Sequence, residues 1–279
     1  MNDMRIAVIM TVHNRKDSTL QCLECLFSQS GSSGYELKVY LTDDGCSDGT
    51  RDAISEKYPQ IQIINGDGTL FWNMGMRKAW IEAAKTDYDF FLWLNDDTFL
   101  FSDAINRLLK ESDIHNDKAI IVGSTCAAGN NSVITYGGWK GNTLLTNTSS
   151  SIECEIFNGN IVLIPRHVFD ILGFNTDMFR HRGGDTEYGL RASRYGIDSW
   201  VAAGLYGECN KHSNEPIWSD PDQPLSKRWR NFFSPLGANP FEFFRFRREY
   251  YGLLPACRTF ITNFVHVLFP RLWVLGKVG

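Results

Sequence analysis

Two adjacent carboxylates, Asp96 and Asp97, come shortly after a run of large apolar residues, Phe90–Leu94. Asn95 separates this run from the two aspartates. Neighbouring carboxylates repel each other unless a positive charge lies close to both. Carboxylate oxygens are the ligands that Mg²⁺ and Mn²⁺ prefer, so the cluster suggests a site for a hard cation. The alternative is that one aspartate caps the following helix while the other is solvated.

Two further polar clusters come earlier in the chain, Thr-Val-His-Asn-Arg at 11–15 and Asp-Asp-Gly-Cys-Ser-Asp-Gly-Thr at 43–50. Each follows a predicted strand. In an open parallel sheet, ligands bind at the carboxyl ends of the strands, so we expect all three clusters to meet in one crevice. For Asp43 and Asp44 taken alone, a turn and a helix cap explain the residue types equally well.

The elements that must position these clusters alternate along the first 125 residues, which predicts a parallel, doubly wound α/β sheet. The expected strands are Arg5–Thr11, Glu36–Asp43, Ile61–Asn65, Phe90–Asn95 and Ala119–Gly123. The expected crossover helices, each beginning near a Ser or Asp cap, are Ser18–Gln29, Asp48–Tyr58, Met74–Lys85 and Ser102–Glu111.

The second half of the chain differs in composition. Residues 126–155 are rich in Gly, Asn, Thr and Ser, which predicts loops and a small irregular sheet. A strand is expected at Phe157–Pro165, followed by a short helix at His167–Leu172 and another at Gly184–Tyr195. We expect this half to cover the opening of the first.

Composition and charge divide the 279 residues in two. A hydrophobic content of 43% and a mean hydropathy of -0.24 exclude a polytopic membrane protein and a disordered chain. Residues 1–225 hold 19 Lys and Arg against 30 Asp and Glu, whereas 226–279 hold 9 against 2. We therefore expect a catalytic domain over 1–225, with halves 1–125 and 126–225, and a basic tail over 226–279.

The seven cysteines are scattered and odd in number, which argues against a disulfide framework and for a reducing compartment. Cys22 and Cys25 lie in a predicted helix with no second pair, so helix packing explains them better than zinc. The first residues read as a strand rather than a secretory signal. These features predict a cytoplasmic location.

The tail interleaves arginines with aromatic residues, a pattern that suits nucleic acid or an anionic membrane surface. The acidic body would repel nucleic acid, which leaves the membrane as the expected partner. The apolar stretch Thr259–Leu275 is interrupted by Arg271 and Pro270 and is too short to span a bilayer, so we expect it to lie in the interface. Packing against the body or a partner subunit is the alternative, and a homodimer is also considered.

The motifs, taken in order, resemble the family-two inverting glycosyltransferases of GT-A fold, and most of all their rhamnosyltransferase-like branch. The resemblance runs from Arg5 to His212. It rests on Thr-Val-His-Asn-Arg, Asp-Asp-Gly-Cys-Ser-Asp-Gly-Thr, Leu-Asn-Asp-Asp-Thr, Phe-Asn-Gly-Asn-Ile-Val-Leu-Ile-Pro and Gly-Gly-Asp-Thr-Glu-Tyr-Gly-Leu-Arg.

The resemblance implies a mostly parallel GT-A sheet and a nucleotide-sugar site. Asp43 would accept a hydrogen bond from the N3–H of uracil or thymine. Asp97 and His212 would bind Mn²⁺ or Mg²⁺, with Asn95 in the place of the first residue of the family's Asp-X-Asp motif. The nucleotide-sugar contacts so implied are Thr11, His13, Asn14, Arg15, Asp43, Asp44, Trp72, Asn73, Asn95 and Asp96.

By the same resemblance, Asp185 would be the base that takes the proton from the acceptor hydroxyl. Gly184 stands where the family often has Glu, and Glu187 follows on the same predicted helix. A carboxylate such as Glu187, or burial, would raise the pKa of the base. An N-cap role explains Asp185 as well, and the two roles are compatible.

The expected activity is transfer of a sugar from a UDP- or dTDP-sugar to a hydroxyl of a saccharide or lipid-linked acceptor, with inversion. It would serve bacterial surface polysaccharide synthesis at the inner face of the cell membrane. Asn95 and Gly184 keep open an alternative, a catalytically idle protein of the same fold that binds a nucleotide sugar or acts as a scaffold.

Overall fold

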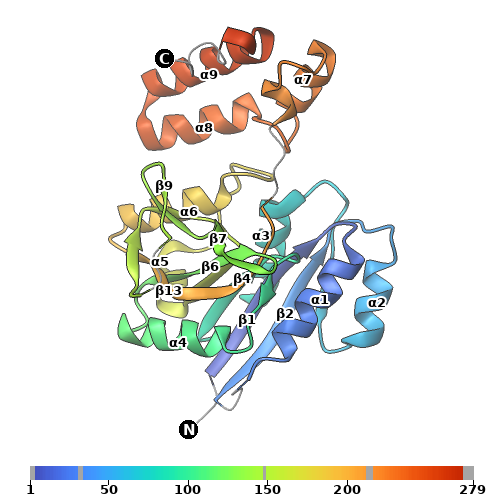
Figure 1. Ribbon diagram of the computed structural model, residues 1–279, viewed down its shortest axis with the longest axis vertical. Coiled ribbons are helices and arrows are strands. Elements are labelled where there is room, and N and C mark those ends of the chain that lie inside the picture. Colours follow the sequence, from blue (N-terminus) through green and yellow to red (C-terminus); the bar gives the residue numbers. More distant parts are fainter. Residues whose placement is uncertain (1–3, 31–33, 147–148, 212–215, 273–279) are drawn as a thin grey trace. The chain divides into compact units, whose positions relative to one another are not determined.

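The computed structural model describes residues 4–30, 34–146, 149–211 and 216–272 (Figure 1). The chain separates into two compact units. The first contains residues up to 176 together with 183–211, and the second contains 177–182 and the chain after 211. The candidate site lies in the first unit.

The parallel half of the central sheet has the order β3-β2-β1-β4. Its strands are β1 (Met4–Val12), β2 (Tyr35–Asp43), β3 (Gln62–Asn65) and β4 (Phe90–Leu94). β1 pairs in parallel with both β2 and β4, and β2 pairs in parallel with β3. This arrangement confirms the predicted parallel sheet and brings the residues after β1, β2 and β4 to one edge.

The sheet continues from β4 through β12 (Ile161–Pro165), β6 (Ile120–Ala127) and β13 (Ser199–Glu208) to β10 (Ile152–Cys154). β12 is antiparallel to both β4 and β6, whereas β13 is parallel to β6. The single strand predicted over 157–165 is wrong, because Asn158-Gly159-Asn160 separates β11 (Ile156–Phe157) from β12. The long strand β13 has no counterpart among the expected elements.

Helices cover both faces of the sheet and form a separate core on each. The side chains of β1 point alternately into these two cores. Ile6, Val8 and Met10 share one core with α1 (Lys16–Phe27), α2 (Thr50–Lys57) and α4 (Ala104–Ile114). Ala7 and Ile9 share the other with α3 (Phe71–Ala83), α5 (Arg166–Leu172) and α6 (Gly184–Arg194). The expected crossover helices α1 to α4 are therefore present, together with α5 and α6 (Figure 1).

The expectation that the crossover helices begin near Ser or Asp caps holds for α2, where Oδ1 of Asp48 accepts the backbone N–H of Thr50 at 3.1 Å. The side chain of the N-cap residue itself makes no capping hydrogen bond in α1, α2, α3 or α4. Side chains from outside these helices satisfy several of the first N–H groups: Asp48 accepts from Lys16, and Gln29 accepts from Ile105. These helix starts therefore depend on tertiary contacts.

Residues 126–155 contribute short strands, as expected. Within this range, β7 (Asn130–Tyr136) pairs with β6. Outside it, the short strand β5 (Phe99–Leu100) pairs with β13. A separate three-stranded sheet has the order β11-β8-β9, with β8 at Gly138–Lys140 and β9 at Thr143–Leu144. The predicted small irregular sheet is therefore confirmed.

The second unit is helical, with η1 (Ile217–Ser219), α7 (Leu225–Phe232), α8 (Pro240–Tyr251) and α9 (Leu253–Leu268). It has its own small apolar core around Phe232, Ala238 and Val267. Phe179, from the short segment 177–182, packs its ring against Phe243 and Phe246 of α8. Among the helices described, none is long and apolar enough to cross a membrane.

Candidate active site

A guanidinium group holds the two aspartates that follow β4. Nη1 of Arg15 lies 2.6 Å from Oδ2 of Asp97 and 3.3 Å from Oδ1 of Asp96. Arg15 directly precedes α1, after the end of β1, so the parallel pairing of β1 with β4 brings the three residues together. The charge repulsion expected from the sequence is thus partly offset by a cation from this chain.

Asp96 is a buried carboxyl group with little stabilisation of its charged form. Burial and the neighbouring charge of Asp97 raise its pKa to about 7, against the opposing effect of Arg15. Its Oδ2 is buried, and no group in the described ranges donates a hydrogen bond to it. An unpartnered carboxylate oxygen in such a place is costly unless a proton or a cation satisfies it.

These oxygens fit part of a site for Mg²⁺ or Mn²⁺. Such ions are often held by one or two carboxylates, with the remaining positions taken by water and substrate phosphates. Oδ2 of Asp96 and the carboxylate of Asp97 supply that donor set. No group of three or more His, Cys, Asp or Glu arranged for a metal occurs within the described part of the chain. His212, the other expected ligand, lies outside the described residues.

Asn95, the first residue of the Asn-Asp-Asp cluster, is engaged by Trp72. The indole Nε1–H of Trp72 donates to Oδ1 of Asn95 at 2.7 Å. Trp72 is in the first turn of α3, and its ring packs edge-on against Trp93 of β4 with centroids 6.0 Å apart. The ring also covers Gly159 so closely that a Cβ there would overlap it. Asn95 therefore helps to position Trp72 above the end of β4.

Asp185 is the second residue of α6, and backbone donors fix its carboxylate. Oδ1 accepts the N–H of Thr186 at 2.8 Å, and Oδ2 accepts the N–H of Gly159 at 3.1 Å. The N-cap is Gly183, in a left-handed conformation with φ 99°, rather than Asp185. Burial raises the pKa of Asp185 despite these two hydrogen bonds. The result is an oriented carboxyl group whose affinity for a proton is increased.

The backbone connects Asp185 to the aspartates after β4. Gly159, which donates to Asp185, is followed by Asn160, whose carbonyl accepts the N–H of Asn95 at 3.1 Å. β12 then runs antiparallel to β4, with Ile161 opposite Leu94. The structure therefore brings Asp185 and the Asn95–Asp97 segment to the same end of the sheet.

Glu187 pairs with an arginine, whereas the sequence suggested that its charge could raise the pKa of Asp185. Its carboxylate pairs with Arg191, with Oε2 and Nη2 3.1 Å apart. Arg191 also donates to the carbonyls of Leu172 and Phe174 and so ties α6 to the end of α5. The raised pKa of Asp185 comes from burial. Arg191 therefore has a structural role.

The two aspartates after β2 are bound by backbone groups. Asp44, 3% exposed, accepts the N–H of Gly68 at 2.9 Å, of Leu70 at 3.3 Å and of Phe71 at 2.8 Å, which closes the start of α3. Asp43 accepts the N–H of Cys46 at 2.8 Å and lies 3.4 Å from Nη1 of Arg51. Asp44 thus serves as the acceptor that the N-terminus of α3 lacks locally.

His13 and Asn14 join the loop after β1 to the loop after β2. Nδ1 of His13 lies 2.6 Å from the carbonyl oxygen of Asp44, so Nδ1–H is the donor and Nε2 is left to accept from Asn14. Oδ1 of Asn14 accepts the N–H of Ser47 at 2.8 Å. Thr11 is buried, with its hydroxyl donating to the carbonyl of Thr42. These contacts build a cross-linked pair of loops.

Asn73 is fully buried, and its amide is used inside the fold. Nδ2 donates to the carbonyl of Thr176, and Oδ1 accepts from Asn175. Gly184 packs so tightly on Asn73 that a Cβ at 184 would overlap its Oδ1. This contact explains why Gly stands where the family often has Glu. A direct contact from Asn73 to a donor sugar stays a prediction.

The structure adds residues that the sequence analysis did not select. Cys209, directly after β13, places Sγ 3.7 Å from Oδ1 of Asp97, and burial raises the pKa of this thiol to about 12. Arg51 links Asp43 to Asn65, whose Oδ1 lies 2.7 Å from its Nη1. Arg51 directly follows the polar cluster at 43–50, which could have pointed to it. No local signal marks Cys209.

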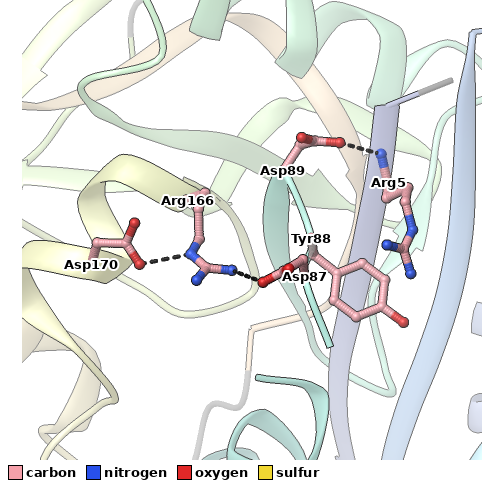
Figure 2. Close-up of a pocket in the computed structure, with 6 residues that line it drawn as sticks. All are labelled: Arg5, Asp87, Tyr88, Asp89, Arg166 and Asp170. Atoms are coloured by element: carbon pink, nitrogen blue, oxygen red, sulfur yellow. Dashed lines mark hydrogen bonds and ion pairs between the residues drawn. The ribbon is translucent and has the colours of Figure 1, made fainter. Parts of the chain in front are cut away.

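A separate pocket of about 380 Å³ lies at the opposite end of the strands (Figure 2). Arg166 of α5 bridges Asp87 and Asp170, and Asp89 accepts the backbone N–H of Arg5 at 2.7 Å. The guanidinium of Arg5 lies over the ring of Tyr88, and the backbone N–H of Arg166 donates to the carbonyl of Asp89, so these contacts join α5 to the starts of β1 and β4. The pocket is therefore best explained as a structural connection.

The comparisons with known proteins agree with the arrangement at the carboxyl ends of the strands. Residues 7–172, more than half of the chain, match the model of glycosyl transferase family 2. A search of curated proteins found no match. The mostly parallel α/β sheet has the GT-A fold, as the resemblance implied. The chain belongs to glycosyl transferase family 2 and is a glycosyltransferase in the general sense of that family.

Proposed function

We propose that this glycosyltransferase moves a sugar from a UDP- or dTDP-sugar to a hydroxyl of a saccharide or lipid-linked acceptor, with inversion at the anomeric carbon. The observation that carries the proposal is the oriented carboxylate of Asp185 at the end of the sheet where Asp96 and Asp97 lie. Asp185 would remove the proton from the acceptor hydroxyl. Asp96 and Asp97 would act at the diphosphate of the donor.

Asp185 would act as the base. Its two backbone hydrogen bonds fix the direction of the carboxylate, and burial raises its pKa toward the range where a base works at neutral pH. A hydroxyl that donates to Asp185 becomes a better nucleophile as the proton leaves. Attack from the side opposite the diphosphate inverts the anomeric configuration.

Asp97 and Asp96 would hold Mn²⁺ or Mg²⁺, with His212 as a further expected ligand. A bound divalent cation would offset the negative charge that develops on the departing diphosphate. In this chain Arg15 already contacts both carboxylates, 2.6 Å from Asp97. Its guanidinium is therefore placed to contact a diphosphate oxygen when it leaves the carboxylates.

The loops after β1 and β2 would bind the nucleotide. His13 and Asn14 connect the two loops, and Asp43 lies at the end of β2 with its carboxylate held by Cys46 N–H and Arg51. A carboxylate oxygen accepts more than one hydrogen bond, so Asp43 retains capacity for the N3–H of a pyrimidine base. Thr11, Asp44 and Asn73 then support this region from inside the fold.

The proposal extends to the rhamnosyltransferase-like branch of the family and to bacterial surface polysaccharide synthesis at the inner face of the membrane. Its support is the order of the motifs, in particular Gly-Gly-Asp-Thr-Glu around Asp185. The donor sugar would be selected by loop residues around the site.

The test uses the purified full chain with Mn²⁺ and a panel of UDP- and dTDP-sugars. We expect one donor to raise the melting temperature and, with a suitable saccharide or lipid-linked acceptor, to be cleaved with release of UDP or dTDP. The anomeric configuration of the product, read by NMR, should be opposite to that of the donor. Donor binding without release over the acceptor panel would favour the idle nucleotide-sugar-binding alternative.

A further inference from the structure

Helix α9 packs one of its sides into the helical unit. Phe260 meets Phe244 of α8, with ring centroids 5.6 Å apart, and Phe264 meets Phe232 of α7, with centroids 5.1 Å apart. Val267 is fully buried. This side of α9 already has its partners within the unit.

The other side of α9 is apolar and exposed. Leu254 is 83% exposed, Ile261 61%, Val265 36% and Leu268 40%. They follow one another at intervals of seven, four and three residues, so they lie along one side of the helix. We call these four residues the apolar stripe. Single exposed apolar residues are ordinary on a protein surface, whereas several of them along one side of a helix indicate an interaction surface.

The surroundings of the apolar stripe are positively charged. Arg258 is exposed between Leu254 and Ile261 on the same side of α9, and Arg248 is exposed on α8. Residues 226–279 contain 9 basic and 2 acidic residues, and both acidic residues are in α8. One of them, Glu242, is paired with Arg180 at 3.4 Å. The sequence after Glu249 has no acidic residue at all.

We propose that the apolar stripe of α9 and its flanking arginines bind the surface of an anionic lipid bilayer. The 16 residues of α9 extend about 24 Å, less than the roughly 30 Å of a hydrocarbon core, and Arg258 interrupts the stripe. A helix of this kind lies along the interface, with its apolar side among the acyl chains and its arginines at lipid phosphates.

Charge favours lipid over a second copy of the chain. Two apolar stripes packed against each other would bring Arg258 of one copy close to Arg258 of the other, and α9 has no acidic residue to pair with them. An anionic lipid surface supplies the missing negative charge. This proposal does not depend on the chemistry proposed for Asp185.

The test is co-sedimentation of the full chain with vesicles of phosphatidylcholine alone or mixed with phosphatidylglycerol. The protein should bind the mixed vesicles and bind phosphatidylcholine much less. Changing Ile261→Glu and Leu268→Glu together removes two apolar groups from the stripe and adds like charge to the lipid surface, so binding should fall by roughly tenfold or more.

The matched control is Ile114→Glu, because Ile114 is also apolar and 68% exposed but lies in α4 of the other unit. It should bind mixed vesicles as the natural protein does. Melting curves of all three proteins show whether each is folded. The proposal is overturned if the natural protein does not bind mixed vesicles or if the double variant binds them equally well. Stripe-dependent dimers without vesicle binding would also overturn it and assign the stripe to a second copy.

Discussion

The loops after β2 and after β4 each carry a buried aspartate in a similar place, but the two carboxylates differ in their hydrogen-bond partners. Asp44 accepts three backbone N–H groups, from Gly68, Leu70 and Phe71. Asp96 has one guanidinium contact at 3.3 Å, and its other oxygen has no donor within the described residues. Both residues are less than a tenth exposed.

This difference distinguishes an aspartate that stabilises the fold from one that is available for binding or catalysis. A carboxylate that is fully hydrogen-bonded to backbone groups holds its loop and keeps its charge at little cost. A buried carboxyl group with few donors has a raised pKa, as Asp96 does, and its charged form would be stabilised by a cation. Asp185 lies between the two cases, oriented by two backbone donors and yet with a pKa raised by burial.

The largest effect should come from Asp185→Asn, which keeps the shape of the side chain and removes the base. Turnover should fall by about a thousandfold, because general base catalysis contributes factors of this order, while donor affinity changes little. Initial rates of UDP or dTDP release and a donor titration measure the two quantities. Full turnover in this variant would contradict the role of Asp185. Asp170→Asn, in the pocket of Figure 2, is the control and should retain activity.

The same role predicts a pH dependence. Asp185 must be ionised to accept a proton, and its pKa is raised above the ordinary 3.8 by burial. Turnover should therefore decline as the pH falls through this raised pKa, at a higher pH than that at which an ordinary aspartate protonates. A profile of turnover against pH measures the decline. A rate that stays constant down to about pH 4 would contradict it.

A stability comparison tests Asp44 against Asp96 directly. Asp44→Ala leaves three backbone N–H groups at the start of α3 without an acceptor, so the free energy of unfolding should fall by about 3 kcal/mol. Asp96→Asn removes a poorly stabilised buried carboxyl group and should change it by less than about 1 kcal/mol. Urea unfolding of both variants measures the difference. Equal losses would show that the two loops do not differ in this way.

Much of the fold could be predicted from the sequence because it depends on local patterns. The alternation of apolar runs with amphipathic segments gave β1 to β4 and α1 to α4 with boundaries close to the observed ones. β13 was missed because Ser199–Glu208 contains two glycines and two alanines in place of a β-branched run. Its pairing with β6 also shifts register near Leu205, which no local pattern announces.

For the candidate site, the sequence motifs identify which residues belong to it. They do not identify the hydrogen-bond partner of each side chain. Asp44 caps α3 from another loop, and Asp185 is oriented by Gly159, 26 residues earlier in the chain. Gly184 seemed a departure from the family pattern, but its close packing against Asn73 explains it. Such contacts exist only once the strands are paired, so sequence spacing does not reveal them.

Removing a guanidinium should affect cation binding near Asp96 and leave it unchanged near Asp43. Arg15→Gln takes away the positive charge that lies 2.6 Å from Asp97, so the carboxylates should bind Mn²⁺ about tenfold more tightly in the absence of donor. Electron paramagnetic resonance of free Mn²⁺ measures this affinity. Arg51→Gln, which removes the 3.4 Å partner of Asp43, is the matched control. An equal gain in both variants would contradict the proposed cation site.

The smallest effect should come from Trp72→Phe, which keeps an aromatic ring at this position and removes the N–H that Asn95 accepts. The loss of this hydrogen bond should lower the free energy of unfolding by about 1 kcal/mol. Because we assign Asn95 to Trp72 and not to the proposed cation site, we expect Mn²⁺ affinity to stay as in the natural protein. A gain comparable to that of Arg15→Gln would instead show that the released amide oxygen binds the cation, and Asn95 would then belong with Asp96 and Asp97 rather than with the framework.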